Sequence, residues 1–308
     1  MSDILHKNHH YLPRGIIKAF GLGKKNQQIF FINKRSGRTA EKTNIKNVAC
    51  INHFYDFEKT NGSLEVDFFG KIDSAAPEII RNLLKINHIS EFNKGRLEEL
   101  ALYVASQICR VPYIYKNLNA LATAFNEQIS KNVEAFGVGT KDFFLEQIKA
   151  NAELYKTLLL NKRMTVCRSE SEAFVIGDNP VVILEHGNNL ITRGRYTSAI
   201  DAKIFMMPIS PTDVLVFFDE WVQEKIYGHV YNNNNWQFAN SVEYVFGHTK
   251  EALENGIRRH YENAYEYIKA INPSLIEEHN LIKGNPISIE QDKYSFEGNA
   301  INALRKMV

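Results

Sequence analysis

The feature that most limits the possible folds is a change in hydrophobic pattern near residue 163. Before it, apolar residues recur at helical spacing over residues 95–121, and the helical pattern continues to residue 162. After it, short apolar runs separated by turn residues are typical of β-strands. These runs occupy residues 164–167, 173–176, 181–184, 203–208 and 213–218. A helical part joined to a part made of short strands predicts an α+β protein.

The turns between these runs predict which strands pair. We expect residues 164–167 and 173–176 to pair around a polar turn, and residues 203–208 to pair with 213–218 around the sequence Pro-Ile-Ser-Pro. A polar loop is expected at Asn232–Asn235, followed by a helix that spans residues 236–245 and by more helix to about residue 270. The last 35 residues look irregular.

An N-terminal β-hairpin is predicted from a strand at residues 28–32, a turn rich in polar residues and Gly, and a return strand within residues 39–50. From Lys24 to Lys46 there are seven Lys or Arg residues and one acid, Glu41. A basic hairpin can follow a phosphate backbone, although a solvated surface hairpin is the commoner reason for such charge.

We therefore predict a single α+β domain over residues 1–250, with a central helical layer packed on antiparallel strands and an N-terminal β-hairpin. Residues 251–308 are predicted to form a helical C-terminal extension and tail. The composition is 44% hydrophobic and 23% charged with a net charge of +2, which favours neither nucleic acid nor membrane as a partner.

Cysteine usage and hydropathy predict the location of the protein. The three cysteines, Cys50, Cys109 and Cys167, lie far apart and lack metal-ligand spacing, which fits a reducing cytoplasm. No apolar run approaches the roughly 18 residues that span a bilayer. Residues 1–25 lack the continuous apolar stretch of a signal peptide. We expect a soluble cytoplasmic protein with no membrane partner.

A candidate site begins at His10, just before a short amphipathic helix. Pro13 suits the first helical position, and the apolar residues that follow it recur at helical spacing. Free N–H groups at a helix N-terminus favour an anion, and an imidazole titrates near neutral pH, so the segment is a possible origin of a site. The alternative is that His10 caps its own helix.

An acidic candidate, Asp73, stands beside a predicted helix that contains Pro77. Because proline is tolerated in the first helical turn but costly in the interior, the helix either begins near Asp73 or begins earlier and kinks at Pro77. Asp73 is then either an N-cap or a carboxylate that serves the site.

A basic candidate, Arg110, ends the clearest helical segment, since Pro112 stops or kinks the helix there. Glu99, Tyr103 and Gln107 share its helix face because they precede it at spacings of three and four. That face is exposed to water by default, and the alternative is that it lines a polar cavity.

The motifs in this order resemble the domain-of-unknown-function family 4238. Its opening, H-Y-x-P-x-x-x-L-x-x-F, is similar to residues 10–20, and its later landmarks are similar to Asp73–Ala76, Arg110–Pro112, Gly177–Val181 and Pro208–Pro211. The resemblance covers roughly residues 8–250. The chain departs from it twice, with Asp73 where the family usually has Glu and Gly177 where it usually has Ser or Thr.

The family has no established reaction, but its general character implies a bacterial toxin or phage-defence effector. The residues themselves suggest phosphoryl chemistry if His10, Asp73, Arg110, Asp178 and Asn179 converge. His10 can act as general acid or base, and Arg110 can clamp a phosphate. Asp73 and Asp178 can orient His10, or hold Mg²⁺ or Mn²⁺ together with it, and Asn179 can donate to a substrate oxygen.

We therefore predict a nuclease or related phosphoesterase, with nucleic acid as a possible partner. The residues assigned to substrate binding are Tyr11, Arg14 and Gln107. The alternative is a non-catalytic binding or sensing module, in which His10 and Asp73 cap helices and Arg110 pairs with Asp178. Among standard enzyme signatures, the sequence contains no P-loop, G-x-G-x-x-G, H-E-x-x-H, G-x-S-x-G or C-x-x-C.

Overall fold

The structure is a computed structural model of the chain. It describes residues 8–34, 39–86, 91–116, 119, 140–170, 173–184 and 202–271. The chain divides into two compact units. Unit 1 comprises residues 1–19 and 45–165, and unit 2 comprises residues 20–44 and 166–308. We did not predict this division, and the domain boundary near residue 250 stays a prediction.

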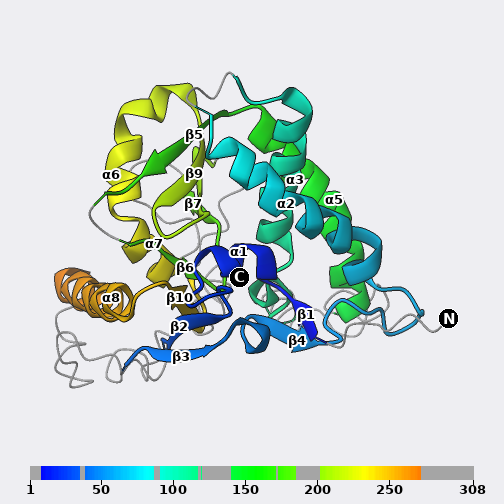
Figure 1. Cartoon of the computed structure of the whole chain (residues 1–308), viewed down its shortest axis with the longest axis horizontal. Helices are drawn as coiled ribbons and strands as arrows, with labels where there is room; N and C mark the ends of the chain where they lie inside the picture. Colours follow the sequence, from blue (N-terminus) through cyan, green and yellow to red (C-terminus); the bar gives the residue numbers. More distant parts are fainter. Residues whose placement is uncertain are drawn as a thin grey trace. The chain divides into compact units, whose positions relative to one another are not determined.

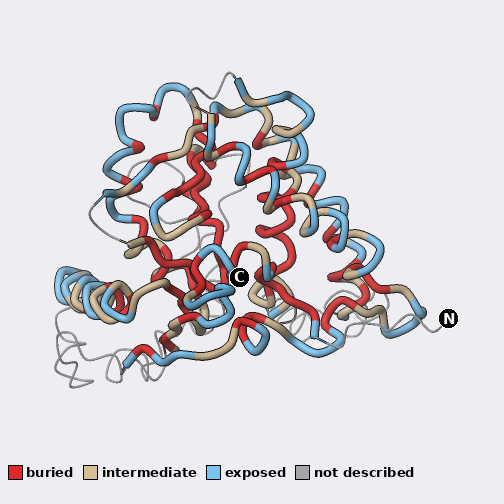
Figure 2. The backbone as a smooth tube through the Cα atoms, in the orientation of Figure 1, coloured by how far each residue is buried: buried red, intermediate tan, exposed pale blue. Residues whose placement is uncertain are grey.

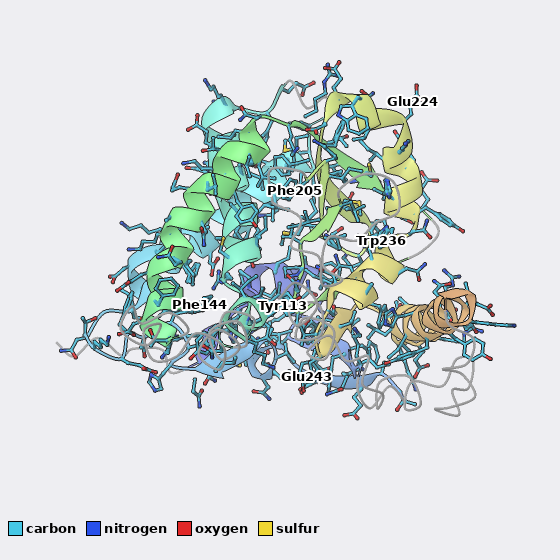
Figure 3. The ribbon with its side chains drawn as sticks, turned by 180° about the vertical axis from the view of Figure 1, so that it is seen from behind. Tyr113, Phe144, Phe205, Glu224, Trp236 and Glu243 are labelled. Atoms are coloured by element: carbon cyan, nitrogen blue, oxygen red, sulfur yellow. The ribbon has the colours of Figure 1, made fainter. Side chains whose placement is uncertain are left out.

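Unit 1 is built on three helices, α2 (Gly70–Leu83), α3 (Lys94–Cys109) and α5 (Lys141–Leu160). Helix α3 packs against both of the others (Figure 1), and Figure 2 shows that most of its backbone is buried. The predicted apolar stripe of α3 is buried from Leu100 to Ile108. On α5, Phe144 (Figure 3) lies with its ring 5.8 Å from that of Phe54.

The N-terminal part of unit 1 brings His10 beside the helices. Strand β1 (Asn8–His10) pairs antiparallel with β4 (Cys50–Asn52). Helix α1 (Arg14–Ala19) begins one residue after Pro13, whose carbonyl accepts the N–H groups of Ile16 and Ile17. Pro13 therefore precedes the helix instead of filling its first position. A short 3₁₀ turn, η1 (Ile45–Asn47), leads into β4.

Of the two starting points predicted for the helix that contains Asp73, the earlier one is correct. A π-helical turn, η2 (Glu65–Phe69), runs directly into α2. Pro77 therefore lies inside a continuous helical segment. Asp73 lies within the first turn of α2 and is not an N-cap, because the N-cap positions of η2 and α2 are Leu64 and Phe69.

Unit 2 contains one four-stranded sheet and most of a second, whose strand β5 (Arg163–Arg168) begins in unit 1 (Figure 1). The strands pair antiparallel wherever the register of a pair is defined. The first sheet has the order β3 (Glu41–Asn44), β2 (Gln28–Asn33), β10 (Tyr244–Gly247), β6 (Val175–Gly177). Strands β2 and β3 form the predicted hairpin. Helix α8 (Lys250–Ile271) packs on β2 and β10, and α7 (Asn233–Asn240) packs on β6.

The second sheet has the order β5 (Arg163–Arg168), β9 (Asp213–Phe218), β8 (Ile204–Pro208), β7 (Val182–Leu184). The predicted β8–β9 pair is confirmed. A 3₁₀ segment, η6 (Glu220–Lys225), and α6 (Ile226–Tyr231) follow β9. Helices together with antiparallel sheets confirm the α+β class.

Two local predictions in unit 2 are wrong. The strands at 164–167 and 173–176 belong to different sheets, because the N–H groups of Ser169 and Phe174 bind the carbonyls of Thr212 and Pro211 instead of closing a hairpin. The helix predicted to residue 245 ends at Asn240 and begins at Asn233, inside the predicted loop. The residues that follow form β10, which pairs with a strand on each side.

The irregular tail predicted for the last 35 residues lies outside the described residues. Among the helices that the structure does describe, none combines the length and the apolar character needed to cross a membrane.

Candidate functional site

The candidate site in unit 1 is centred on Arg110, which follows α3 and is 0% exposed. Its Nη1 donates to both carboxylate oxygens of Asp73 at 2.8 Å, and its Nη2 donates to the carbonyl of His10 at 2.6 Å. The guanidinium carbon lies 3.9 Å from the centre of the Phe69 ring, in a cation–π contact. Arg110 thereby joins β1, η2 and α2 to the end of α3.

Tyr55 completes the surroundings of Arg110. Its hydroxyl donates to the Arg110 carbonyl at 2.8 Å and lies 3.5 Å from Arg110 Nε. Its N–H donates to Nδ1 of His9 at 2.9 Å, and the two rings stack with centroids 5.8 Å apart. Burial raises the pKa of Tyr55 well above its usual range, so the phenol stays neutral.

Two carboxylates face the one guanidinium. Burial raises the pKa of Asp73, and its contact with Arg110 opposes that rise. Glu65 Oε2 lies 3.9 Å from Arg110 Nη2 and has no hydrogen-bond partner among the described residues. Burial raises the pKa of Glu65 to about 7, and the negative charges of Asp73 and Asp56 add to the rise against the pull of Arg110. Glu65 therefore titrates near neutral pH.

His10 carries the second titratable group of the site. Its residue is 7% exposed, and neither ring nitrogen has a hydrogen-bond partner within the described part of the chain. Burial and the positive charges of Arg14 and Arg110 lower the pKa of His10 to about 4. The imidazole is therefore neutral at neutral pH. The alternative that His10 caps α1 is wrong, since such a cap needs a ring nitrogen bound to the helix.

A second set of polar groups in unit 1 surrounds Asp56. Its Oδ2 lies 2.7 Å from Nδ1 of the exposed His53, and its Oδ1 lies 3.6 Å from Nε2 of His9. Burial raises the pKa of Asp56, but the Ser63 hydroxyl, the hydrogen bond with His53 and the nearby imidazoles lower that pKa by more, so the net shift is downward. Asp56 therefore stays ionised near Glu65.

Three of the predicted catalytic residues, His10, Asp73 and Arg110, come together in this cluster. The face of α3 that carries Gln107 and Arg110 was expected to be exposed to water. That expectation is wrong, because both side chains are fully buried. Gln107 Nε2 donates to the Ser106 hydroxyl at 3.2 Å, and its Oε1 has no partner among the described residues. Of the other residues assigned to substrate binding, Tyr11 is buried and its N–H binds the carbonyl of Ala49, whereas Arg14 is exposed.

The other two predicted catalytic residues, Asp178 and Asn179, belong to unit 2 and serve its structure. The Asp178 carboxylate accepts the backbone N–H groups of residues 242–244 at 2.8–2.9 Å. Burial raises the pKa of Asp178, and those three hydrogen bonds oppose the rise. Asn179 Nδ2 lies 3.2 Å from Oδ1 of Asn240. The alternative that Arg110 pairs with Asp178 is wrong, because Asp73 is the partner of Arg110.

Two of the three metal ligands suggested by the sequence are engaged by other groups of the protein. In residues 8–271, so far as they are described, no three His, Cys, Asp or Glu side chains lie close enough together to hold an ion. His10, Asp73 and Asp178 therefore do not fit Mg²⁺ or Mn²⁺ as a joint ligand set, because Asp73 is bound by Arg110 and Asp178 by backbone N–H groups.

The predicted basic hairpin is only partly available to a phosphate backbone. Lys24, Lys25 and Lys42 are exposed. Lys34 is buried, and its Nζ donates to the carbonyl of Ser241 at 2.7 Å, so it stabilises the fold of unit 2. Arg35 and Arg38 lie outside the described residues.

Comparison with known proteins places the chain in a family but supplies no activity. Searches of curated proteins and of solved structures gave no match. The family model described as "Protein of unknown function (DUF4238)" matches residues 8–251, which include every residue of the Arg110 cluster and of the Asp178 network. The chain therefore belongs to the DUF4238 family, which confirms the resemblance found in its sequence.

Proposed function

We propose that the chain hydrolyses phosphodiester bonds, as a nuclease or a related phosphoesterase, with Glu65 and His10 as its acid and base. One observation carries the proposal. Two titratable side chains belong to residues that contact the same buried guanidinium, and their pKa values are shifted in opposite directions. Groups whose environments push their pKa values apart are typical of an acid and a base within one site.

The unpartnered atoms of the two side chains support the same proposal. Glu65 Oε2 and both ring nitrogens of His10 are buried without a partner among the described residues. Native proteins pair nearly all of their buried polar atoms, so such groups are expected to bind something else. A substrate oxygen and an attacking water are groups of the right chemistry.

In this mechanism Glu65 is the general acid and His10 the general base. Between about pH 4 and pH 7, Glu65 is protonated and His10 is neutral. His10 takes a proton from the water that attacks phosphorus, and Glu65 gives its proton to the departing oxygen. A phosphodiester and water thereby become a phosphomonoester and an alcohol. Arg110 holds positive charge beside both groups, and Asp73 fixes its position.

A second candidate function is a non-catalytic binding or sensing module. It is favoured by the partners that the Arg110 guanidinium already has within the protein. This guanidinium is fully buried and binds Asp73, the His10 carbonyl and the Tyr55 hydroxyl. It is therefore not open to the phosphate clamp predicted from the sequence. In this case the cluster fixes how β1 and α2 dock on α3, which is a structural use of a buried ion pair.

The test is a cleavage assay with the full-length protein. Single- and double-stranded DNA and RNA are incubated with Mg²⁺, Mn²⁺ or EDTA over a range from about pH 3 to pH 9. We expect a bell-shaped pH profile with limbs near pH 4 and pH 7. Glu65→Gln and His10→Ala are each expected to lower the rate by at least about 100-fold.

The matched control is Glu78→Gln, which changes an exposed carboxylate of α2 and is expected to keep the wild-type rate. Equal cleavage by the wild type and by His10→Ala would remove His10 from the mechanism. An absence of cleavage under every condition would favour the binding module.

We also propose the effector role that the family resemblance implies. Expression of the wild-type protein in a bacterial host is then expected to slow growth, and expression of Glu65→Gln to equal amounts is not. Equal growth with both proteins would argue against a toxic activity that depends on Glu65.

A further inference from the structure

Helix α7 binds residues 173–181 of unit 2 through carboxamide side chains that repeat every three residues. Asn234, Gln237 and Asn240 each hydrogen-bond to backbone groups of that segment at 2.7–3.0 Å. Asn234 and Gln237 each accept a backbone N–H and donate to a backbone carbonyl, as an adjacent strand does, and Asn240 donates to two backbone carbonyls. This face of the helix therefore uses its amides fully for structure.

Asn233, on the same helix, is different. It is 0% exposed, yet within the described part of the chain neither Nδ2 nor Oδ1 has a hydrogen-bond partner. Trp236 (Figure 3) lies one turn along and packs on the apolar cluster of β7, β8 and β9, and its Nε1 has no such partner either. Unpaired buried polar groups are rare and costly in native proteins. Two neighbours on one helix therefore have donor and acceptor atoms that are available to a ligand.

The unused atoms define what that ligand must offer. Asn233 Nδ2 and Trp236 Nε1 are donors, and Asn233 Oδ1 is an acceptor. A carboxylate would satisfy the donors and leave the acceptor unpaired, and a cation would satisfy the acceptor alone. A planar group that carries a donor beside an acceptor satisfies both kinds of atom.

The unpaired atoms belong to a carboxamide and an indole, which are both neutral, and this favours a neutral ligand. The ring of His229 lies 6.4 Å from that of Trp236. Burial and the charge of Lys225 lower the pKa of His229, so its imidazole is neutral at neutral pH. Planarity, neutrality and adjacent donor and acceptor groups are together typical of a nucleobase. Adenine fits best, since its N6 amino group and N7 pair with an Asn carboxamide.

We infer that unit 2 carries a nucleobase-binding site formed by Asn233 and Trp236 of α7. The inference does not depend on the proposed hydrolase, whose residues belong to unit 1. The base can come from a free nucleoside or from a single-stranded nucleic acid, and both present the same chemistry to the carboxamide.

The test is calorimetric titration of the full-length protein with adenosine, guanosine, cytidine and uridine, and with short oligonucleotides of each base. We expect saturable binding that is tightest for adenosine or for the adenine oligonucleotide. Asn233→Leu is expected to weaken it by at least about tenfold, and Trp236→Phe, which keeps a ring but removes the N–H, by several-fold. Binding of oligonucleotides alone would assign the base to a strand.

The matched control is Asn235→Leu, which changes a less buried amide of the same helix and is expected to leave binding unchanged. Melting curves establish that each variant is folded, and Trp236→Phe keeps the test open if Asn233→Leu does not fold. The inference is overturned if no nucleoside or oligonucleotide binds the wild type. It is also overturned if Asn233→Leu and Trp236→Phe, when folded, bind as tightly as the wild type does.

Discussion

Two aspartates predicted to be catalytic, Asp73 in unit 1 and Asp178 in unit 2, lie in polar networks of different kinds. Asp178 accepts three backbone N–H groups, and its neighbour Asn179 pairs with Asn240. Asp73 binds a single buried guanidinium that is also contacted by Glu65 and His10, and Oε2 of Glu65 and both ring nitrogens of His10 have no hydrogen-bond partner among the described residues. A saturated network stabilises a fold, whereas unpaired atoms around a charged group are free to bind a substrate.

The largest loss of stability is expected for Arg110→Met, which tests the network around Asp73. Removing the guanidinium leaves Asp73 and Glu65 as neighbouring carboxylates without their cation. We expect a loss of about 4 kcal/mol in the free energy of unfolding, measured by urea denaturation at neutral pH. The double variant Arg110→Met/Asp73→Asn is expected to recover part of it. A loss below about 1 kcal/mol would mean that Arg110 does not hold unit 1 together.

The next effect concerns the saturated network of unit 2. Asp178→Ala leaves three backbone N–H groups without their charged acceptor, so we expect a loss of about 3 kcal/mol in the free energy of unfolding. Asp178→Asn keeps one acceptor oxygen and is expected to lose about half as much. Any phosphodiesterase activity per folded molecule is expected to persist. A variant that is folded but inactive would indicate that Asp178 takes part in catalysis.

A smaller effect concerns Gly177, the last residue of β6. A Cβ atom built there would collide with Oγ of Ser241, which donates to the carbonyl of Gln237 at 2.6 Å. Gly177→Ser is therefore expected to lower the free energy of unfolding by about 2 kcal/mol through overpacking. Ser241→Gly in the same chain is expected to restore most of it. Additive losses in the double variant would contradict this account.

The sequence was sufficient for elements whose pattern is local. The apolar stripe of α3, the β2–β3 hairpin and the β8–β9 pair were predicted because spacing and turn residues specify them within a few residues. The sequence also singled out His10, Asp73 and Arg110, and the Arg110 guanidinium binds the Asp73 carboxylate and the His10 carbonyl. The environment of those residues was not predictable from the same patterns.

The predictions that failed concern contacts between distant segments. Arg110 is buried because Tyr55 and Phe69 cover it, and nothing in the spacing of α3 indicates those rings. Glu65 was missed for the same reason, since it reaches Arg110 only because η2 runs directly into α2. Asp178 follows a strand as many catalytic acids do, but residues 242–244 turn their N–H groups toward it.

Glu65→Gln tests whether the folded protein disfavours the ionised form of Glu65. The pKa of Glu65 is about 7 in the folded protein and about 4.5 ordinarily, so folding favours its protonated form. The stability that this provides is complete below about pH 4.5 and is lost as the pH rises through 7. Because Gln resembles the protonated acid, we expect the variant to be more stable than the wild type by about 1–2 kcal/mol at pH 8, after allowance for solvent screening. Equal stability at pH 8 would place the Glu65 pKa near its ordinary value.

His10→Gln gives the smallest effect and the opposite slope. The pKa of His10 is lowered from 6.5 to about 4, so its contribution to stability is complete above pH 6.5 and is lost as the pH falls toward 4. Between pH 6.5 and pH 4.5 this slope opposes that of Glu65, and the wild-type curve should be nearly flat. Without His10 the Glu65 slope remains, so His10→Gln is expected to gain about 1 kcal/mol on acidification from pH 6.5 to pH 5. Urea denaturation across that range measures it, with Glu65→Gln as the control that loses stability over the same interval. A His10→Gln curve parallel to that of the wild type would mean that His10 is not held neutral in the folded protein, and it would then have no shifted pKa to make it the base.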